Sequence, residues 1–272
     1  MIGIGVNIRP KFFGSGAAPL DPDATAFITA AGITDATQQS AINTLVVDLK
    51  TYGIWTKMKA IYPFVGGTAT THKWNLKDPR DLDAAFRLVF SGGWTHSSNG
   101  ATPNGTNGIA NTFIVPNTLS QFSTHLSYYS RTNNDGPYFE MGFGPATSRI
   151  VMGIKSSGTA FYDQNNNTNG RITFSMASTN STGLFLTSRT ANNLQKAYRN
   201  SGQIGSTNTN TITSSLPSNG QIRIGAFTDN VLFIYSNREC AFSSIGSGLT
   251  DTEAANLYTA VQAYQTTLSR NV

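Results

Sequence analysis

The side chains best suited to acid–base chemistry are few and far apart in this sequence. It holds three glutamates, Glu140, Glu239 and Glu253. Most glycoside hydrolases use two carboxylates that lie close together, and side chains on one face of a strand are two residues apart. Only Glu253 has a second acid at such a spacing, Asp251, and both stand where a helix is expected to begin. Glycoside hydrolysis is therefore the least favoured function, and we expect no catalytic residues.

The three histidines give little support for metal or nucleophilic chemistry. His72, His96 and His125 lack the His-x-x-x-His spacing of a zinc helix, and no nucleophile-elbow motif accompanies them. A Ser–His–Asp triad stays open on composition alone. We expect His72 and His96 to occupy partly exposed structural positions, and we expect the protein not to be an enzyme.

Aromatic side chains on loops are the residues that could bind a carbohydrate, because sugar rings pack on aromatic faces while amides bind the hydroxyls. Polar, asparagine-rich loops are expected at residues 97–111, 163–170 and 200–219. The sequence does not separate surface aromatics from core aromatics. The candidates for glycan contact are Trp74, Trp94, Tyr128, Tyr129 and Tyr162.

Composition excludes several other classes of protein. The net charge is +5, but the basic residues are scattered and form no run, so we expect no nucleic-acid partner. No segment approaches the roughly 20 apolar residues of a membrane helix, so no membrane insertion is expected. The start of the sequence lacks the apolar core of a signal peptide, so we expect synthesis in a cytoplasm and export, if any, by a route other than a cleaved signal. The single cysteine, Cys240, is expected to be a buried structural thiol.

Residues 1–20 are expected to form an N-terminal arm. Ile2, Ile4, Val6 and Ile8 alternate with small or polar residues, which is the period of a strand with one apolar face. Such an arm is either an edge strand of its own domain or a segment that adds to the sheet of a neighbouring subunit.

Helices are predicted at both ends of the remaining chain. Residues 21–53 contain two, the first ending at Gly32 and the second capped by Asp35. A last helix over about 251–269 begins at a capping box formed by Thr250 and Glu253.

Between these helices the sequence alternates at the period of strands. Residues 54–64 predict a long strand, and the charged stretch 78–87 predicts a solvated turn with local ion pairs. Asn-Gly turns separate the shorter segments. The pattern predicts a mainly β, antiparallel two-sheet sandwich over residues 54–272. The further strands are expected at 85–91, 122–130, 137–144, 148–155, 171–177, 182–188, 194–199, 221–227 and 231–236.

Residues 193–202 resemble the strand-turn-strand of laminin-G-like, concanavalin A-like domains. Tyr198 precedes an Asn-Gly turn into which Ser201 is inserted, and Ile224-Gly225 matches the apolar-glycine pair of a later strand. The resemblance implies a concanavalin A-like jelly roll. It also implies calcium as the one cofactor to consider, with Asp135 or Asp163 as ligands, although both aspartates equally suit turns.

Longer segments resemble a module that recurs in bacteriophage virion structural proteins. They are residues 27–67, 75–81, 90–97 and 249–268, so the resemblance extends over about 22–272. It implies a virion protein, made in the host cytoplasm, that forms an exposed appendage or decoration on a tail, fibre or head. The arm would attach it to other virion proteins through Ile2, Ile4, Val6 and Ile8. A homo-oligomer is expected, because particles repeat their parts by symmetry. The alternative is a glycan-binding module that recognises the host surface.

Overall fold

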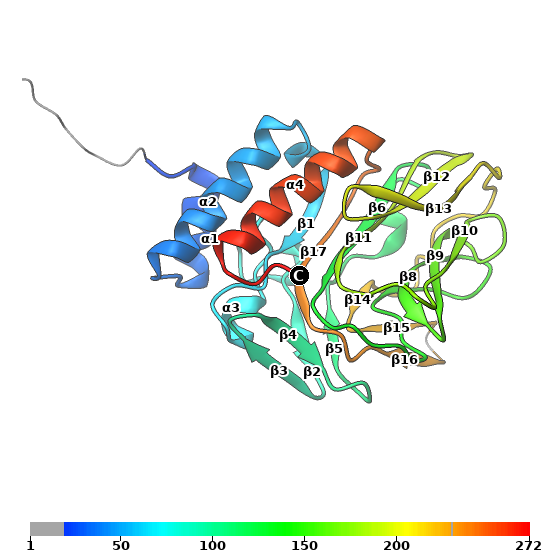
Figure 1. Ribbon diagram of the computed structural model, residues 1–272, viewed down its shortest axis with the longest axis horizontal. Coiled ribbons are helices and arrows are strands. Elements are labelled where there is room, and N and C mark those ends of the chain that lie inside the picture. The colour runs from blue at the N-terminus through cyan, green and yellow to red at the C-terminus, as the bar shows by residue number, and fades with distance from the viewer. Residues whose placement is uncertain (1–18, 230) are drawn as a thin grey trace, which may run out of the picture.

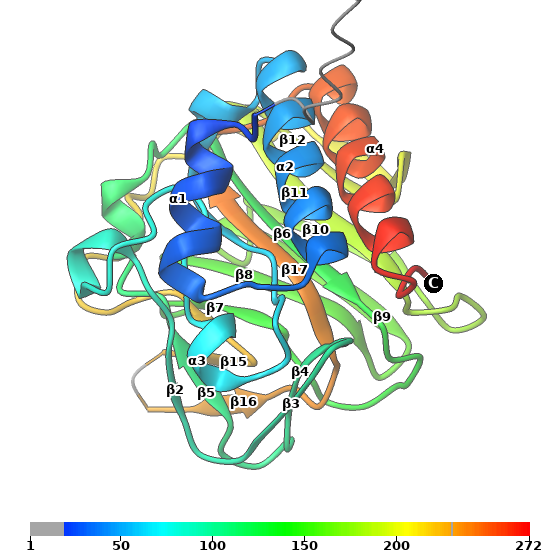
Figure 2. The same ribbon diagram turned by 90° about the vertical axis from the view of Figure 1, so that its left-hand side faces the viewer.

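The computed structural model describes residues 19–229 and 231–272. Two antiparallel sheets lie face to face, and three longer helices cover the outer face of one of them (Figures 1 and 2). This arrangement confirms the predicted mainly β sandwich with helices near both ends of the described chain. The arm residues Ile2, Ile4, Val6 and Ile8 lie outside the described residues.

The helices begin and end at the residues that the sequence marks. Helix α1 (Pro22–Ala31) ends at Gly32, whose φ of 65° is left-handed, and α2 (Ala36–Thr51) begins where the Asp35 side chain accepts a hydrogen bond from the Gln38 amide. Helix α4 (Asp251–Thr267) begins at the complete capping box of Thr250 and Glu253. The short helical elements are η1 (Trp55–Lys57), α3 (Ala69–His72), η2 (Asp83–Ala85) and η3 (Pro116–Thr118).

The first sheet has the order β13-β12-β11-β6-β17-β4-β3, with β1 also paired to β17. The interior strand β17, which pairs with β6, β4 and β1, is the last strand of the sequence. The strands are β1 (Met58–Tyr62), β3 (Trp94–Ser97), β4 (Gly100–Pro103), β6 (Thr124–Ser130), β11 (Gly183–Ala191), β12 (Leu194–Arg199), β13 (Gly202–Asn208) and β17 (Cys240–Gly246).

The second sheet has the order β10-β9-β8-β7-β14-β5-β2, and a separate hairpin pairs β15 with β16. Its strands are β2 (Val89–Ser91), β5 (Ile109–Asn111), β7 (Met141–Phe143), β8 (Arg149–Ser156), β9 (Thr159–Asn165), β10 (Arg171–Ser175) and β14 (Arg223–Ile224). The hairpin strands are β15 (Ala226–Thr228) and β16 (Phe233–Tyr235).

Two hydrophobic cores fill the spaces between the three layers. Along β6, Leu126 and Tyr128 face the second sheet, whereas Tyr129 faces the helices. Successive side chains of a strand point to opposite faces, so one strand serves both cores. Every residue of β6 and of β17 is buried for this reason. The predicted buried thiol of Cys240 is confirmed.

Several strand predictions are wrong in their bounds. The long strand expected at 54–64 is the 3-10 turn η1 followed by β1, because Trp55 turns into the core below the helices. The predicted loop 97–111 contains β4 and β5, the loop 163–170 begins with the end of β9, and the loop 200–219 contains β13. These strands are short and rich in Gly, Asn, Ser and Thr, which weakens the alternation of apolar side chains.

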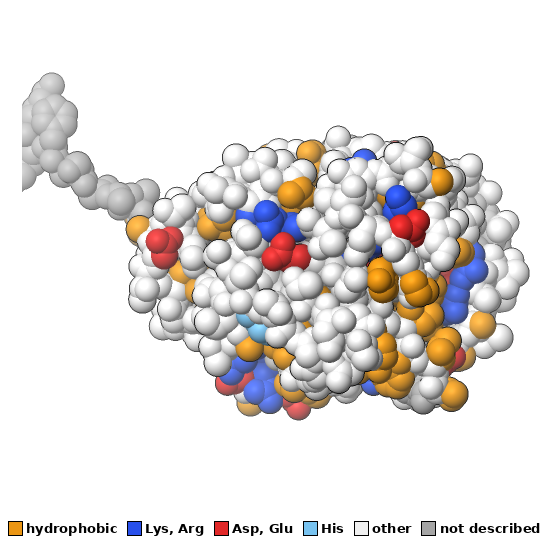
Figure 3. Space-filling model, turned by 60° about the horizontal axis from the view of Figure 1, so that its bottom comes forward, with side chains coloured by type: hydrophobic (Ala, Val, Ile, Leu, Met, Phe, Trp, Pro, Cys, Tyr) orange, Lys and Arg blue, Asp and Glu red, His pale blue; other side chains and the backbone are white. Residues whose placement is uncertain are grey.

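The surface carries few charges, as the composition requires. Figure 3 shows one face on which blue and red side chains stand in small separate groups. In the stretch 78–87, Asp81 binds both Lys73 and Arg87, which confirms the predicted solvated cluster of ion pairs. In the described part of the chain, no helix is long and apolar enough to span a membrane.

Candidate functional site

A pocket of about 320 Å³ lies where strands β11 and β12 meet the first turn of α4. Here we name it the β12–α4 pocket. The sheet contributes one wall and the start of the helix the other. The lining side chains from the sheet are Ser188, Thr190, Leu194, Lys196 and Tyr198, and those from the helix side are Leu249, Thr250, Asp251 and Thr252.

Strand alternation and the helix cap place the charged groups of this pocket. Lys196 and Tyr198 are two residues apart on β12, so both side chains point to the helical side of the sheet. The capping box fixes Thr250 and thereby sets Asp251 as the first residue of α4. Lys57 strengthens this helix start, because its Nζ lies 2.6 Å from Glu253 Oε1.

Asp251 is the electrostatic centre of the pocket. Lys196 Nζ lies 2.7 Å from its Oδ2, and the Tyr198 hydroxyl donates to its Oδ1 at 2.8 Å. These two hydrogen bonds, with that of Lys196 the stronger cause, lower the pKa of Asp251, so the carboxylate is ionised at neutral pH. Its side chain is still 66% exposed, which leaves its oxygens open to a ligand.

This arrangement fits the hydroxyl groups of a sugar. A carboxylate accepts hydrogen bonds, an ammonium donates them, and threonine hydroxyls do both. Leu194, which is 36% exposed, adds apolar surface for the carbon side of a ring. The volume is at the lower end of known small-ligand sites, which range from about 300 to 1,000 Å³. The pocket therefore has the size and the polar groups to hold one or two sugar rings.

Sequence patterns did not reveal this pocket. Lys196 and Asp251 are 55 positions apart, and each had a complete local explanation, as a strand residue and as a residue at a helix start. The one relevant sequence signal was the capping box. It predicts the residue at which α4 begins, but it does not predict that β12 lies across from that helix start.

Three of the aromatic residues predicted to contact glycans are in the interior, so that prediction is wrong for them. Tyr128, Tyr129 and Tyr162 are fully buried. The Tyr128 hydroxyl donates to the Arg238 carbonyl at 2.7 Å, and the Tyr129 hydroxyl accepts from the Val272 amide at 3.0 Å. Tyr129 lies in the core under the helices, whereas Tyr128 and Tyr162 lie in the core between the two sheets, so none of the three rings is open to a ligand.

The two tryptophans among the glycan candidates, Trp74 and Trp94, are partly buried and lie outside the β12–α4 pocket. Trp74 packs on the helical core with Lys73 Nζ 4.7 Å from its ring centre. Trp94 packs edge-on against Phe90, and Gly225 makes room for it: a Cβ at Gly225 would lie 2.6 Å from the indole. Both rings have a structural contact on one side, and their glycan role stays a prediction.

The carboxylate of Asp163 is not a calcium ligand in this fold. It is fully buried and is bound by two guanidinium groups, at 2.5 Å from Arg149 Nε and 2.7 Å from Arg171 Nε. Two cations already surround it, so a third would be repelled. Asp135 is exposed and accepts a hydrogen bond from the Gly158 amide at 3.0 Å. Among the residues that the structure describes, no three His, Cys, Asp or Glu side chains converge as metal ligands.

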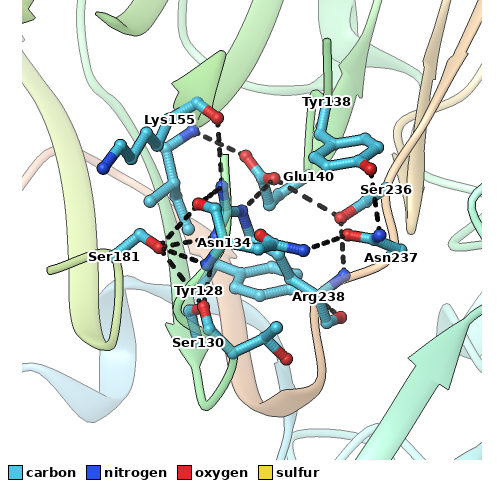
Figure 4. A network of polar contacts seen from close by, with 12 residues as sticks. Tyr128, Ser130, Asn134, Tyr138, Glu140, Lys155, Ser181, Ser236, Asn237 and Arg238 are labelled. Carbon is cyan, nitrogen blue, oxygen red and sulfur yellow. Dashed lines mark hydrogen bonds and ion pairs between the residues drawn. The ribbon is translucent and has the colours of Figure 1, made fainter. Parts of the chain in front are cut away.

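Glu140 also has structural partners, in a buried polar network between the sheets (Figure 4). Arg238 Nε lies 2.9 Å from Glu140 Oε1, and neither side chain is exposed to solvent. The Ile154 amide donates to the second carboxylate oxygen at 2.6 Å. Burial raises the pKa of Glu140, and the positive charge of Arg238 opposes that shift. No ligand reaches this carboxylate without opening the sandwich.

The histidines also have structural partners. His125 is buried; its Nδ1 donates to the Ser247 carbonyl at 2.6 Å and its Nε2 accepts from Ser244 Oγ at 3.0 Å. A carbonyl, not a carboxylate, therefore orients this imidazole. His72 is 1% exposed, which corrects the expected partial exposure, and its Nδ1 lies 2.9 Å from that of the half-buried His96.

Comparison with known proteins shows similarity in structure alone. No model of a protein family matches the chain, and no curated protein matches its sequence. A structure of botulinum neurotoxin type C, whose way into cells depends upon interaction with two ganglioside molecules, is similar with a TM-score of 0.51 and 13% identity. The match covers 78% of this chain and 53% of the toxin chain.

Two other solved structures align less closely. The binding domain of botulinum neurotoxin DC, in complex with rat synaptotagmin II, has a TM-score of 0.45 and 13% identity over 77% of this chain and 53% of its own. A Trypanosoma rangeli sialidase has a TM-score of 0.45 and 12% identity over 81% of this chain and 38% of its own. This chain thus spans about half the length of the toxin chains. At such identity the likeness to neurotoxin type C establishes the fold alone, a two-sheet antiparallel β sandwich.

Proposed function

We propose that this protein is a non-catalytic glycan-binding module. The observation that carries the proposal is the β12–α4 pocket, in which an ionised, largely exposed carboxylate stands beside an ammonium group and several hydroxyls. Such a set binds the hydroxyls of a sugar and contains no second carboxylate for hydrolysis.

The structural neighbour supports a binding role by analogy of fold. The neurotoxin type C that shares this sandwich interacts with gangliosides, which are glycolipids. The glutamates support a role without catalysis, since each one already has a structural partner. Glu140 is paired with Arg238, Glu239 with Arg131 and Glu253 with Lys57.

A glycan array probed with the purified chain tests this function, with Asp251→Ala as the diagnostic variant. Loss of a hydrogen bond to a charged group costs about 1.5–3 kcal/mol, so we expect affinity for the array hit to fall about tenfold or more. Asp81→Ala is the matched control. Asp81 is also an exposed aspartate with two side-chain partners, Lys73 and Arg87, but it lies outside the pocket. A folded protein that binds no glycan, or equal binding by Asp251→Ala, would refute the proposal.

We further propose that the module is displayed on a bacteriophage particle. The support is the resemblance of residues 22–272 to a virion module, together with the alternation of Ile2, Ile4, Val6 and Ile8 in the arm. The proposed partners are other virion proteins and further copies of this chain, with a surface glycan of the host as ligand. Deletion of residues 2–19 should leave a folded glycan-binding domain that no longer joins particles. Normal incorporation of the deleted chain would contradict the anchoring role.

A further inference from the structure

A second groove, of about 350 Å³, lies where the edge strands of the two sheets meet. Strand β10 is an edge strand of the second sheet, and β13 is an edge strand of the first sheet. The Asn208 amide joins them, donating to the carbonyls of Asn169 at 2.8 Å and Arg171 at 3.0 Å. Gly205, at φ 66°, lets the strands approach, since a Cβ there would lie 3.1 Å from Ile172. We name this site the β10–β13 groove.

Arg171 is the only charged residue that lines the groove, and its guanidinium lies against Asp163 and Phe161 of the neighbouring strand β9. Arg149 and Arg171 share the single carboxylate of Asp163, so one guanidinium charge is not neutralised by it. No groove-lining residue is acidic, and neither arginine has another carboxylate within 4 Å among the described residues. The hydrogen bond to Asp163 raises the pKa of Arg171, so the guanidinium stays protonated.

Arg171 is held in a fixed orientation and is still open to solvent. Its Nε and Nη2 donate to Asp163 at 2.7 and 2.8 Å, and its guanidinium carbon lies 5.2 Å from the centre of the Phe161 ring. Its Nη1 has no hydrogen-bond partner among the described residues, and the side chain is 26% exposed. A guanidinium that is already oriented loses little conformational entropy when it binds an anion.

We propose that the β10–β13 groove binds the acidic sugar of a glycan through its carboxylate. The Nη1 of Arg171, at the border of the groove beside β9, would supply the charge-assisted hydrogen bond to the carboxylate. The exposed side chains of Thr173, Thr209 and Asn210 supply hydroxyls and an amide for the rest of the ring. This site is separate from the β12–α4 pocket and goes beyond the function proposed for it.

Binding of sialyllactose and of trigalacturonic acid to the full chain, measured by calorimetry at low and high salt, tests the inference. Lactose and a sulfated disaccharide are the neutral and the non-carboxylate anionic controls. We expect at least one carboxylate probe to bind, and its affinity to fall as salt rises because the contact is partly exposed. Failure of both carboxylate probes, or equal binding of the sulfated probe, would overturn the assignment.

Two variants locate the site. Arg171→Gln removes the charge, while Arg149 remains to pair with Asp163. Thr209→Asp instead places a carboxylate in the groove at an exposed position and leaves the Arg171–Asp163 contact intact, so it serves if Arg171→Gln is unstable. Each should weaken binding of the acidic probe about tenfold, the scale of one charge-assisted hydrogen bond. Thr106→Asp adds the same charge at an exposed turn between β4 and β5 and should have no effect.

Asp251→Ala separates this inference from the proposed function. Acidic-probe binding that survives Asp251→Ala but not Thr209→Asp would assign the carboxylate to the β10–β13 groove. The reverse pattern would place it in the β12–α4 pocket, which would overturn the inference and leave the proposed function standing.

Discussion

Arg238 shows how a charged side chain is accommodated in the core at the scale of a single residue. A guanidinium has five N–H donors, and here five hydrogen bonds use them. Besides Glu140, the acceptors are the carbonyls of Thr132, Asn134 and Lys155 and the hydroxyl of Ser181. Because no donor is left without an acceptor, the buried charge is tolerated, and four segments distant in sequence are held together (Figure 4).

Removing one member of this pair should be far more harmful than removing both. Arg238→Met leaves the buried Glu140 carboxylate without its cation, and we expect the free energy of unfolding to fall by about 3–5 kcal/mol. The double variant Glu140→Leu with Arg238→Met should recover part of that loss. Urea denaturation followed by circular dichroism measures both. A single-variant loss below about 1 kcal/mol, the range of exposed pairs, would contradict the described burial.

The buried imidazole of His125 predicts how the free energy of unfolding depends on pH. Burial lowers the pKa of His125 to about 4 from its usual 6.5. Between these values the unfolded chain binds a proton that the folded chain does not, so acid favours unfolding by about 1.4 kcal/mol per pH unit for this group. Above pH 6.5 the contribution vanishes. The urea midpoint should therefore fall as pH drops from 6.5 to 4, and it should fall less steeply in His125→Gln; identical slopes would contradict this assignment.

At the scale of an element, the start of α4 both stabilises the helix and shapes the β12–α4 pocket. Thr250→Ala removes the cap acceptor of the Glu253 amide and should cost about 1 kcal/mol. Thr259→Ala is the matched control, because Thr259 is an exposed threonine within the same helix whose hydroxyl donates only to the Ala255 carbonyl. It should be neutral or slightly stabilising, since alanine is the better helix former. Equal effects on thermal unfolding would show that the cap contributes nothing.

The helices could be predicted from the sequence because their signals are local. Asp35, Gly32 and the pair Thr250 and Glu253 each act within four residues, and the structure has all of these caps. Strand β17 could not be recognised in the same way. Its two serines, Ser243 and Ser244, interrupt the apolar pattern, and both are buried only because a layer covers each face of the sheet.

The site was less predictable than the fold for a related reason. Burial of Tyr128, Tyr129 and Tyr162 depends on which strands become central, and that is decided by pairings over long sequence distances. The pairing of Asp163 with two arginines likewise joins neighbouring strands β8, β9 and β10, and no short motif encodes it. Types of residue were visible in the sequence, but their neighbours were not.

At the scale of the whole molecule, the helical layer is part of the fold rather than an addition to it. Helices α1, α2 and α4 share one core with the outer face of the first sheet, including Tyr129, Leu184 and Phe242. The C-terminal end is fixed as well, since Arg270 donates to the carbonyls of Pro63, Phe64 and Ala241. The sheet has apolar side chains on both faces and needs a cover on each.

Truncation after Leu249 should therefore prevent folding, although every strand would still be present. Loss of α4 exposes the apolar outer face of the first sheet, and we expect aggregation or strong binding of a hydrophobic dye. Deletion of residues 2–19, which removes a segment of similar length, is the control and should leave a soluble domain. A truncated chain that unfolds cooperatively at the normal temperature would refute the structural role of the layer.

The interior position of β17 in the first sheet has a consequence for how the protein is made. Ribosomes add roughly 5–20 residues per second from the N-terminal end. The strands on both sides of β17 leave the ribosome well before it, and Arg270 must then reach back 206 residues to the Phe64 carbonyl. Until that moment β6 has an unpaired edge. We infer that the first sheet closes only after β17 has been synthesised, late in the production of this chain.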